Sequence, residues 1–264
     1  MRERSLCSRS RTRIRRALVT FAALPLAFLA PTALALTADD VTVTLNGQSL
    51  LPDLECVQDS FGSQLSCFGQ NLSANDGSWT IPSIELHFGG DDQFYAGMTA
   101  FFSVRNDLAE TETFDFFQER PFSSTFPFNE YRSYATIGAT LVDLGADGAL
   151  LTDVGTPIFT GSIDGSPVQT ELDPPQTVTA PPSGSVAFSA SRSTLTVKPQ
   201  ISIGQHATFG LSANDLVAFD FSQPPTAGHH VVHFEVAPVV IPEPGTLALV
   251  TAGLASVAAH RRRA

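Results

Sequence analysis

Hydrophobic and polar residues alternate in short runs along the middle of the chain, and turn-forming residues separate these runs. In the run 79–88, Ile84 and Leu86 would share one face of an extended strand. Glu85 and His87 would share the opposite face, as expected of a strand with one buried side. Similar runs, rich in β-branched and aromatic residues, cover residues 41–45, 79–88, 94–104, 113–117, 131–141, 158–163, 185–189, 194–197, 201–203, 207–211, 216–221 and 231–236. Because no stretch among them has a helical period, the pattern predicts an all-β antiparallel sandwich, with a jelly roll as one arrangement.

Turn signals divide these runs. Asn46-Gly47 is a strong signal for a tight hairpin turn. The Pro-rich segment 173–184 is either a linker between two halves or a long loop within one sandwich. We favour the loop, because neither half looks able to fold alone.

One five-residue string, Leu-Ser-Ala-Asn-Asp, occurs at residues 72–76 and again at residues 211–215. Asn and Asp suit turns, since their side chains bond to nearby backbone and tolerate positive φ. The repeat is either a duplicated strand–turn–strand unit or two turns that arose independently. The flanking residues do not align, which favours independent turns.

The N-terminal residues read as a secretion signal. Residues 2–16 are rich in Arg, and Ala17–Ala30 is an apolar run interrupted by one proline. Ala33 and Ala35 then supply the small-x-small pattern of a cleavage site, which would leave Leu36 as the first mature residue. An uncleaved anchor and a twin-arginine signal fit less well, because the apolar run is short and the residues after the arginine pair depart from that pattern.

The C-terminal residues form a second targeting signal. It consists, in order, of Pro242-Glu243-Pro244, an apolar run from Leu247 to Ala259, and the basic residues Arg261, Arg262 and Arg263. The apolar run predicts a short transmembrane helix, marginal for crossing a bilayer, with the arginines left on the cytoplasmic side. The two prolines keep the segment before it extended and accessible to a processing enzyme.

This tail resembles that of the PEP-CTERM proteins of Gram-negative bacteria. The resemblance implies recognition by an exosortase, a membrane-embedded cysteine protease that removes the tail. It also implies a link to extracellular polysaccharide and biofilm. We therefore expect a signal peptide at residues 1–35, a secreted β-sandwich at 36–240 and a sorting signal at 241–264.

The charge is divided unevenly along the chain. The whole chain has 15 basic and 26 acidic residues and a net charge of −11, but seven Arg lie within the first sixteen residues. Between residues 36 and 240, twenty-four acidic residues face five basic ones, giving a net charge of −19. Those five are Arg105, Arg120, Arg132, Arg192 and Lys198. Such a body is a poor partner for nucleic acid or for an anionic lipid surface, because both require clustered basic residues.

Two cysteines remain once the N-terminal segment is set aside. Cys56 and Cys67 are eleven positions apart and enclose a hairpin-like segment. Export to an oxidising compartment predicts a disulfide between them. A metal or redox pair is the alternative, but Cys/His partners at metal-site spacing are lacking nearby.

The candidate metal ligands are weaker signals. His229, His230 and His233 resemble a ligand cluster, yet in a strand His229 and His233 would stand about 13 Å apart, too far for one tetrahedral ion. Solvent-facing strand histidines are the favoured interpretation. Calcium is a possible cofactor, and the best candidates to bind it are Asp143, Asp147, Asp91 and Asp92. Neither acidic loop has EF-hand spacing, and Asp-Gly pairs also form ordinary turns.

Catalytic motifs are missing from the sequence: it has no nucleophile elbow and no phosphate loop. Aromatic residues that could stack on sugar rings or simply fill a core are Trp79, Tyr95, Tyr131 and Tyr134. A dense group that we expect to fill a core comprises Phe114, Phe116, Phe117, Phe122, Phe126 and Phe128. We expect a non-enzymatic surface or extracellular-matrix protein with a structural or adhesive role. The alternatives are a carbohydrate- or calcium-binding module and a polysaccharide hydrolase.

Overall fold

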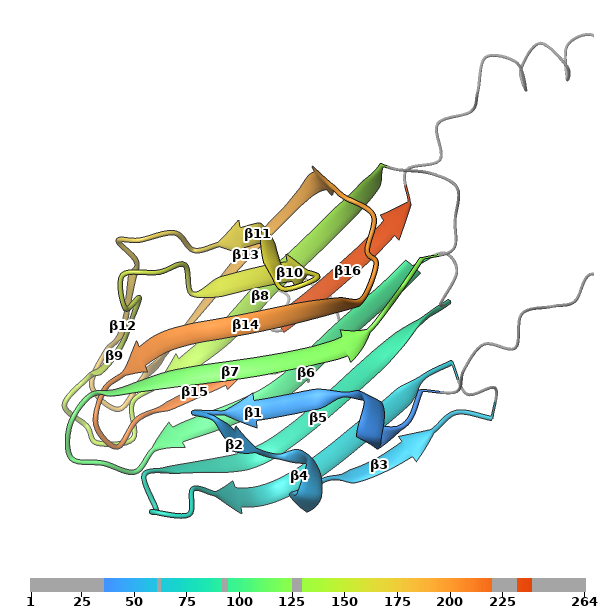
Figure 1. The fold of residues 1–264 in the computed structure, drawn as a ribbon. Coiled ribbons are helices and arrows are strands. Elements are labelled where there is room, and N and C mark those ends of the chain that lie inside the picture. Colours follow the sequence, from blue (N-terminus) through green and yellow to red (C-terminus); the bar gives the residue numbers. More distant parts are fainter. Residues whose placement is uncertain (1–35, 61–62, 92–94, 125–129, 220–231, 239–264) are drawn as a thin grey trace, which may run out of the picture. The chain divides into compact units, whose positions relative to one another are not determined.

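The computed structural model describes residues 36–60, 63–91, 95–124, 130–219 and 232–238, all within one compact unit. These residues form two antiparallel sheets, with only two short 3-10 helices, η1 (Ala38–Asp40) and η2 (Leu51–Asp53) (Figure 1). The sheets face each other across a single hydrophobic core, so the predicted all-β sandwich is confirmed.

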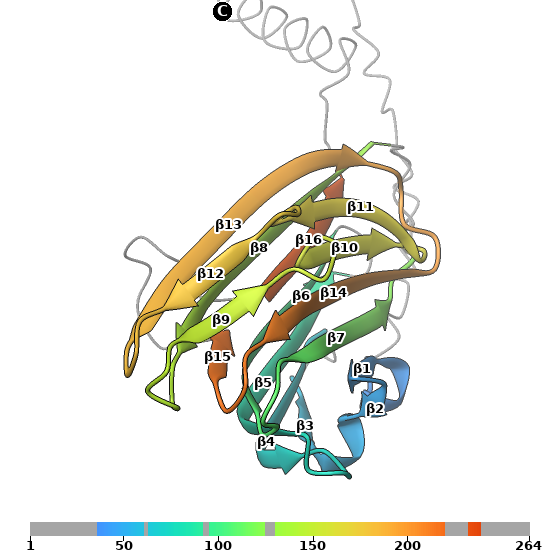
Figure 2. The same ribbon diagram turned by 90° about the vertical axis from the view of Figure 1, so that its left-hand side faces the viewer.

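The first sheet contains, in spatial order, β11 (Ser166–Glu171), β10 (Phe159–Ile163), β14 (Ser202–Leu211), β7 (Glu112–Pro121), β1 (Thr42–Leu45) and β2 (Gln48–Ser49), with β9 (Ala149–Thr152) beside β14 and β12 (Thr177–Ala180) beside β9. The second contains β13 (Ser185–Thr196), β8 (Tyr131–Val142), β15 (Leu216–Phe219), β6 (Tyr95–Asn106), β5 (Trp79–Asp91), β4 (Leu65–Ser73) and β3 (Glu55–Gln58), with β16 (Val232–Pro238) between β6 and β8. Figure 2 shows the same strands after a turn of 90° about the vertical axis.

Stacked phenylalanines fill the space between the layers. Phe102 of β6 stacks on Phe116 of β7 with ring centroids 4.4 Å apart, and on Phe219 of β15 at 4.8 Å. Phe114 and Phe209, neighbours on β7 and β14, lie 5.7 Å apart. All five side chains are buried, so Phe114 and Phe116 fill the core as expected. Fully burying each of these side chains contributes about 1.5–3 kcal/mol.

The remaining members of the predicted phenylalanine group behave differently. Phe122 is buried, whereas Phe117 is half-buried on the outer face of the first sheet. Phe126 and Phe128 lie outside the described residues.

Two strands share one position in the second sheet. Phe219, the last residue of β15, pairs with Phe102 of β6, and Val232, the first residue of β16, pairs with Ala100. The chain therefore leaves the position between β6 and β8 and re-enters it two residues further along β6. Both β15 and β16 are hydrogen-bonded on both sides, to β6 and to β8.

Several strands differ from the sequence prediction for local reasons. The separate runs 185–189 and 194–197 are one strand, β13, and 201–203 and 207–211 are one strand, β14. β4 was missed because it contains the turn-forming residues Gly69 and Asn71, and Asn71 has a φ of 53°. The segment 173–184 contains β12, so it belongs to one sandwich and is not a linker.

The structure contains the hairpin turn predicted at Asn46-Gly47 and a turn at each copy of the repeated five-residue string. Asn46 and Gly47 join β1 to β2 with φ values of 48° and 75°, as a tight hairpin turn requires. The repeated strings lie at different turns: the first copy places its positive φ at Gly77, after the string, and the second at Asn214, within it. This difference agrees with two turns of independent origin.

Helices that could cross a membrane are absent from the described ranges. The apolar run 247–259 and the N-terminal segment lie outside those ranges.

A disulfide joins Cys56 to Cys67 on paired positions of β3 and β4, with Cα atoms 4.0 Å apart. Cys67 is fully buried, and β3 is the edge strand of the second sheet. The bridge therefore fastens an edge strand that has only one hydrogen-bonded neighbour.

Reducing this disulfide should lower the free energy of unfolding by about 3 kcal/mol in the chain-entropy account of an eleven-residue separation. Urea unfolding of the oxidised protein, of the reduced protein and of a Cys56→Ser/Cys67→Ser variant would measure the change. Equal midpoints for all three forms would contradict a stabilising role.

Candidate functional site

A groove lies on the outer face of the second sheet, over β4, β5, β6 and β15. Its volume is about 330 Å³. The lining residues are Phe68, Gly69, Gln70, Ser83, Ile84, Glu85, Phe101, Phe102, Ser103, Leu216, Ala218 and Phe219. The lining therefore combines large side chains with small ones such as Ser83, Ser103 and Ala218.

The hollow arises from an irregularity in β5. The β5–β6 pairing shifts register between Thr80 and Ile84, where β5 contains one residue more than its partner. Such a bulge bends a strand and redirects its side chains. The small side chains Ser83, Ser103 and Ala218 lie beside it and leave the space open.

An aromatic strip runs across three strands beside the groove. Phe68 on β4, His87 on β5 and Phe101 on β6 all lie on the outer face. The His87 ring meets Phe68 edge-on at 6.2 Å and Phe101 at 5.7 Å. Phe68 is 40% exposed, so part of this strip is open to solvent.

Hydrogen bonds hold His87 in this position. Ser66 Oγ lies 2.9 Å from His87 Nδ1, and Glu85 Oε1 lies 2.8 Å from His87 Nε2. Both side chains of the His87–Glu85 pair are substantially exposed, at 39% and 47%. Glu85 is the single carboxylate among the described residues that line the groove.

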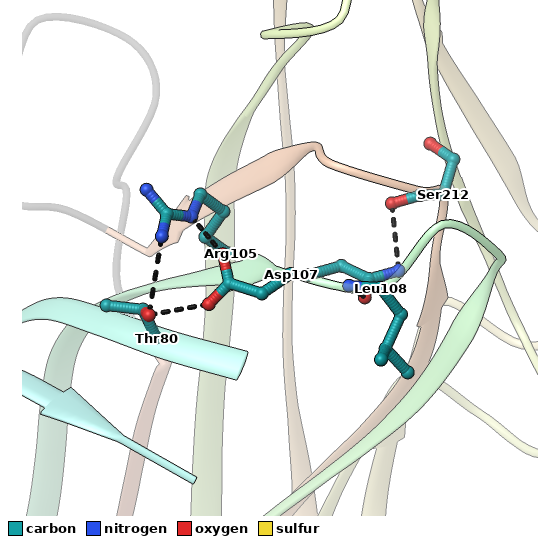
Figure 3. Close-up of polar contacts among 6 residues, drawn as sticks. Thr80, Arg105, Asp107, Leu108 and Ser212 are labelled. Carbon is teal, nitrogen blue, oxygen red and sulfur yellow. Dashed lines mark hydrogen bonds and ion pairs between the residues drawn. The ribbon is translucent and has the colours of Figure 1, made fainter. Parts of the chain in front are cut away.

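A polar cluster lies at one end of the groove (Figure 3). Arg105 on β6 pairs with Asp107 and donates from Nη2 to Thr80 Oγ1 at 3.4 Å. Thr80 also donates to Asp107 Oδ2, at 2.5 Å. The guanidinium nearest the groove is therefore neutralised by its own neighbour.

The residue between Arg105 and Asp107 points inward. Asn106 is fully buried, and its Nδ2 donates to the carbonyl oxygens of Glu110, Leu211 and Ser212 at 2.8–3.1 Å. Its Oδ1 accepts from the Leu108 backbone N–H at 3.0 Å. This side chain joins the β6–β7 loop to the end of β14, so the cluster rests on a fixed backbone.

Most of the aromatic residues singled out in the sequence lie elsewhere. Trp79 and Tyr131 are buried in the core, which excludes them from stacking on a sugar. Tyr134 is 39% exposed on β8, outside the groove lining. The side chain of Tyr95 lies outside the described part of the structure.

Asp143, one of the two calcium candidates in this loop, serves as a hydrogen-bond acceptor for the loop backbone, and a calcium role for Asp143 and Asp147 stays a prediction. The Asp143 carboxylate accepts backbone N–H bonds from Gly145, Ala146, Gly148 and Ser183, at 2.5–3.2 Å. Its oxygens therefore already act as acceptors for the loop, whereas calcium needs six to eight free oxygens at one point. In the described part of the chain, no group of three or more His, Cys, Asp or Glu residues could hold a metal ion.

The remaining metal candidates fall partly or wholly outside the described structure. Asp92, His229 and His230 lie outside it. Asp91 and His233 are described only as backbone positions, in β5 and β16. Their predicted roles stay predictions.

Asp143 and Asp215 form a buried acid pair between two loops. Burial would raise the pKa of Asp143, but backbone hydrogen bonds from Ser183, Gly148 and Gly145 hold that pKa below its ordinary value. Burial raises the pKa of Asp215, despite hydrogen bonds from Ser212 and Leu144. The pKa values of the two carboxyl groups are therefore shifted in opposite directions.

A second buried polar group joins the sheets at the β11 edge. Ser133 Oγ donates to Gln169 Oε1 at 3.0 Å, and Gln169 Nε2 donates to Glu171 Oε1 at 2.9 Å. Burial raises the pKa of Glu171, although Arg192 lies 4.0 Å away. This chain of contacts crosses from β8 to β11 and fixes the spacing of the two layers at that edge.

The sequence analysis did not select the groove residues. Glu85 and His87 were placed on the solvent face of their strand, which is correct. Phe101 was hidden, because Phe101 and Phe102 are adjacent and give no sign of which one faces out. Phe68 lies on a strand that the turn-like composition of β4 concealed.

In the sequence, the β-sandwich is followed by the tripartite tail of Pro-Glu-Pro, an apolar run and a basic cluster. The family model of the PEP-CTERM protein-sorting motif matches residues 240–263, which confirms the expected resemblance. The chain therefore carries a PEP-CTERM sorting motif, and this motif implies export, exosortase recognition and a surface or extracellular location. No curated protein matches the chain.

Three solved structures show distant similarity. TmCBM61 in complex with beta-1,4-galactotriose has 12% identity and a TM-score of 0.25, covering 75% of this chain and 88% of that one. The enzymatically active domain of tailspike protein 4 from bacteriophage CBA120 has 9% identity and a TM-score of 0.21, covering 75% and 19%. A galactose mutarotase related enzyme from Lactobacillus acidophilus has 10% identity and a TM-score of 0.22, covering 78% and 80%. We transfer no function from them.

Asp143→Asn should destabilise the protein far more than Asp147→Asn, because an amide NH₂ would face backbone N–H donors in place of a carboxylate oxygen. A lowered pKa means that the Asp143 carboxylate stabilises the fold above its ordinary pKa, and that this contribution is lost as pH falls through the lowered value. The deficit of Asp143→Asn should therefore be largest at neutral pH and shrink in acid. Thermal unfolding from pH 7 down to pH 2 would measure it, and equal effects of the two variants would exclude this role.

Proposed function

We propose that the exported β-sandwich binds an uncharged polysaccharide in the outer groove of its second sheet. It acts without turnover, as a structural or adhesive component of the cell surface or extracellular matrix. An exosortase removes the tail beforehand. The observation that carries the proposal is the aromatic strip beside a hollow whose lining includes hydroxyl, amide and carboxylate groups.

The groove has the two kinds of surface that a sugar ring requires. The apolar faces of Phe68 and Phe101 suit the C–H face of a pyranose ring, and the polar side chains of Gln70, Ser83 and Glu85 suit its hydroxyl groups. Binding sites commonly combine apolar walls with a few placed polar groups in this way.

Charge favours an uncharged ligand. Glu85 places a carboxyl group in the groove, and Arg105 beside the groove is paired with Asp107. The surrounding body carries a net charge of −19, which repels uronate and phosphate groups.

The groove chemistry supports binding over hydrolysis. A glycosidase of the usual kind needs two carboxyl groups about 5–10 Å apart, and the described lining supplies Glu85 alone. Ser66, His87 and Glu85 resemble a nucleophile–base–acid chain. Ser66 and His87 are, however, directly paired in the middle of the sheet, where neighbouring backbone N–H groups serve the strand pairing and not an oxyanion.

Replacing Phe101 with Ala should weaken glycan binding about tenfold, equivalent to ~1.4 kcal/mol, because one stacking surface is lost. Phe117→Ala is the matched control, since Phe117 is also half-buried and also meets a histidine edge-on, on the opposite sheet. A glycan array with and without calcium would identify the ligand, and affinity electrophoresis would then compare the variants. Unchanged binding by Phe101→Ala, or preferential binding of acidic polysaccharides, would reject the groove as the site.

The tail should be removed in the native host. Intact mass of the mature protein should end near Pro244, because Pro242 to Pro244 present an extended site for the protease. Deleting Pro242–Pro244 should leave the precursor in the inner membrane. A mature chain ending at Ala264, or normal release of the deletion variant, would contradict processing.

A further inference from the structure

The end of the sandwich next to the sorting motif is defined by strand register. Tyr131, the first residue of β8, pairs with Thr196 at the end of β13 and with Pro238 at the end of β16. These three strand ends therefore lie side by side, at the upper right of Figure 1. The sorting motif begins at residue 240, directly after β16.

This end carries an exposed hydrophobic group that we call the apolar tip: Leu195, Val197 and Ile201. Their exposed fractions of 60%, 64% and 71% are the highest among the large hydrophobic side chains that the structure describes. Leu195 belongs to β13, and the other two lie in the connection from β13 to β14. Hydrophobic side chains this exposed, close together in one segment, indicate a contact surface.

The backbone of the apolar tip is held in place. The Asp164 carboxylate accepts N–H bonds from Gln200, Ile201 and Ser202 at 2.8–3.2 Å. The Ile201 carbonyl accepts from the Phe122 N–H at 2.9 Å. The side chains are thus presented outward by a fixed loop.

The charge at this end differs from that of the whole body. Arg132, paired in register with Leu195, and Lys198, next to Val197, are two of the five basic residues between residues 36 and 240. They offset Glu130 and Asp164, the acidic residues beside them in the chain and in space. The local balance is near zero, so the strong repulsion expected between the −19 body and anionic lipid is weakest here.

We propose that the apolar tip rests on the lipid surface of the membrane that holds the sorting tail, for as long as the tail is attached. Eight residues lie between Pro238 and Leu247, the start of the apolar run, and the connection spans about 30 Å at most. This tether gives the tip a high effective concentration at the bilayer, so a weak contact is enough. Removal of the tail leaves an acidic body with a small apolar contact, and the protein dissociates.

This contact orients the precursor, with the outer groove along the side of the sandwich and the tail end toward the lipid. The proposed membrane contact depends on the sorting motif and is independent of glycan binding in the groove. A negative result for membrane contact would not contradict glycan binding, and the reverse also holds, because the groove and the apolar tip share no residue.

Site-directed spin labelling of the full chain in phosphatidylcholine–phosphatidylglycerol vesicles tests the contact. Cys7→Ser removes the remaining free cysteine, and Val197→Cys or Leu144→Cys then carries the label. Leu144 is the matched control, because it is 54% exposed and follows the opposite end of β8. We expect the label at 197 to be several-fold less accessible to a water-soluble nickel complex, and more accessible to oxygen, than the label at 144.

Three further results show whether the apolar tip contacts lipid, a protein partner or neither. The expected mature form, residues 36–244, should lose the difference between the two labels and should not sediment with vesicles. Equal nickel accessibility at both positions in the full chain would overturn the proposal. Protection that appears only when exosortase is added to the vesicles would assign the tip to a protein partner and would also overturn it.

Discussion

The centre of the second sheet is completed by the last strands of the domain, and this constraint governs the rest of the structure. β6 and β8 leave one position between them, and β15 and β16 fill it in turn. Without these segments both strands would present unpaired backbone groups in the middle of the sheet, where they have no solvent to satisfy them. The sheet is therefore complete only when the chain reaches Pro238, two positions before the sorting motif begins.

The same arrangement positions both surfaces to which we assign a role. The groove borders β15, whose Leu216 and Ala218 form one side of it, while the bulge in β5 opens its floor. The apolar tip lies beside the end of β16, through the shared pairing with Tyr131. Ligand binding and membrane contact would therefore occupy different parts of one rigid sheet, so that the glycan-facing side remains open while the tail end is held.

The fold class and the C-terminal sorting motif followed from local features of the sequence. Alternation in 79–88 and 131–141 gives the strand period directly, and Asn46-Gly47 gives a turn. Long-range pairing did not follow, because nothing local shows that β15 and β16 share one position or that β13 pairs along its whole length with β8. The groove was equally hidden. It depends on a one-residue bulge, on which of Phe101 and Phe102 faces outward, and on a strand whose Gly69 and Asn71 look like a turn. The sequence also could not show that the Asp143 carboxylate accepts hydrogen bonds from the backbone of its own loop.

The pairing of β16 on both sides is the feature on which this account depends most directly, and native-state amide hydrogen exchange measures it. The amide groups of β16 should exchange as slowly as those of β6 and β8, with protection approaching that of global unfolding, because β16 is an interior strand. The edge strands β2 and β3 should exchange much faster. Exchange of β16 at the rate of these edge strands, with β6 and β8 still protected, would contradict the account.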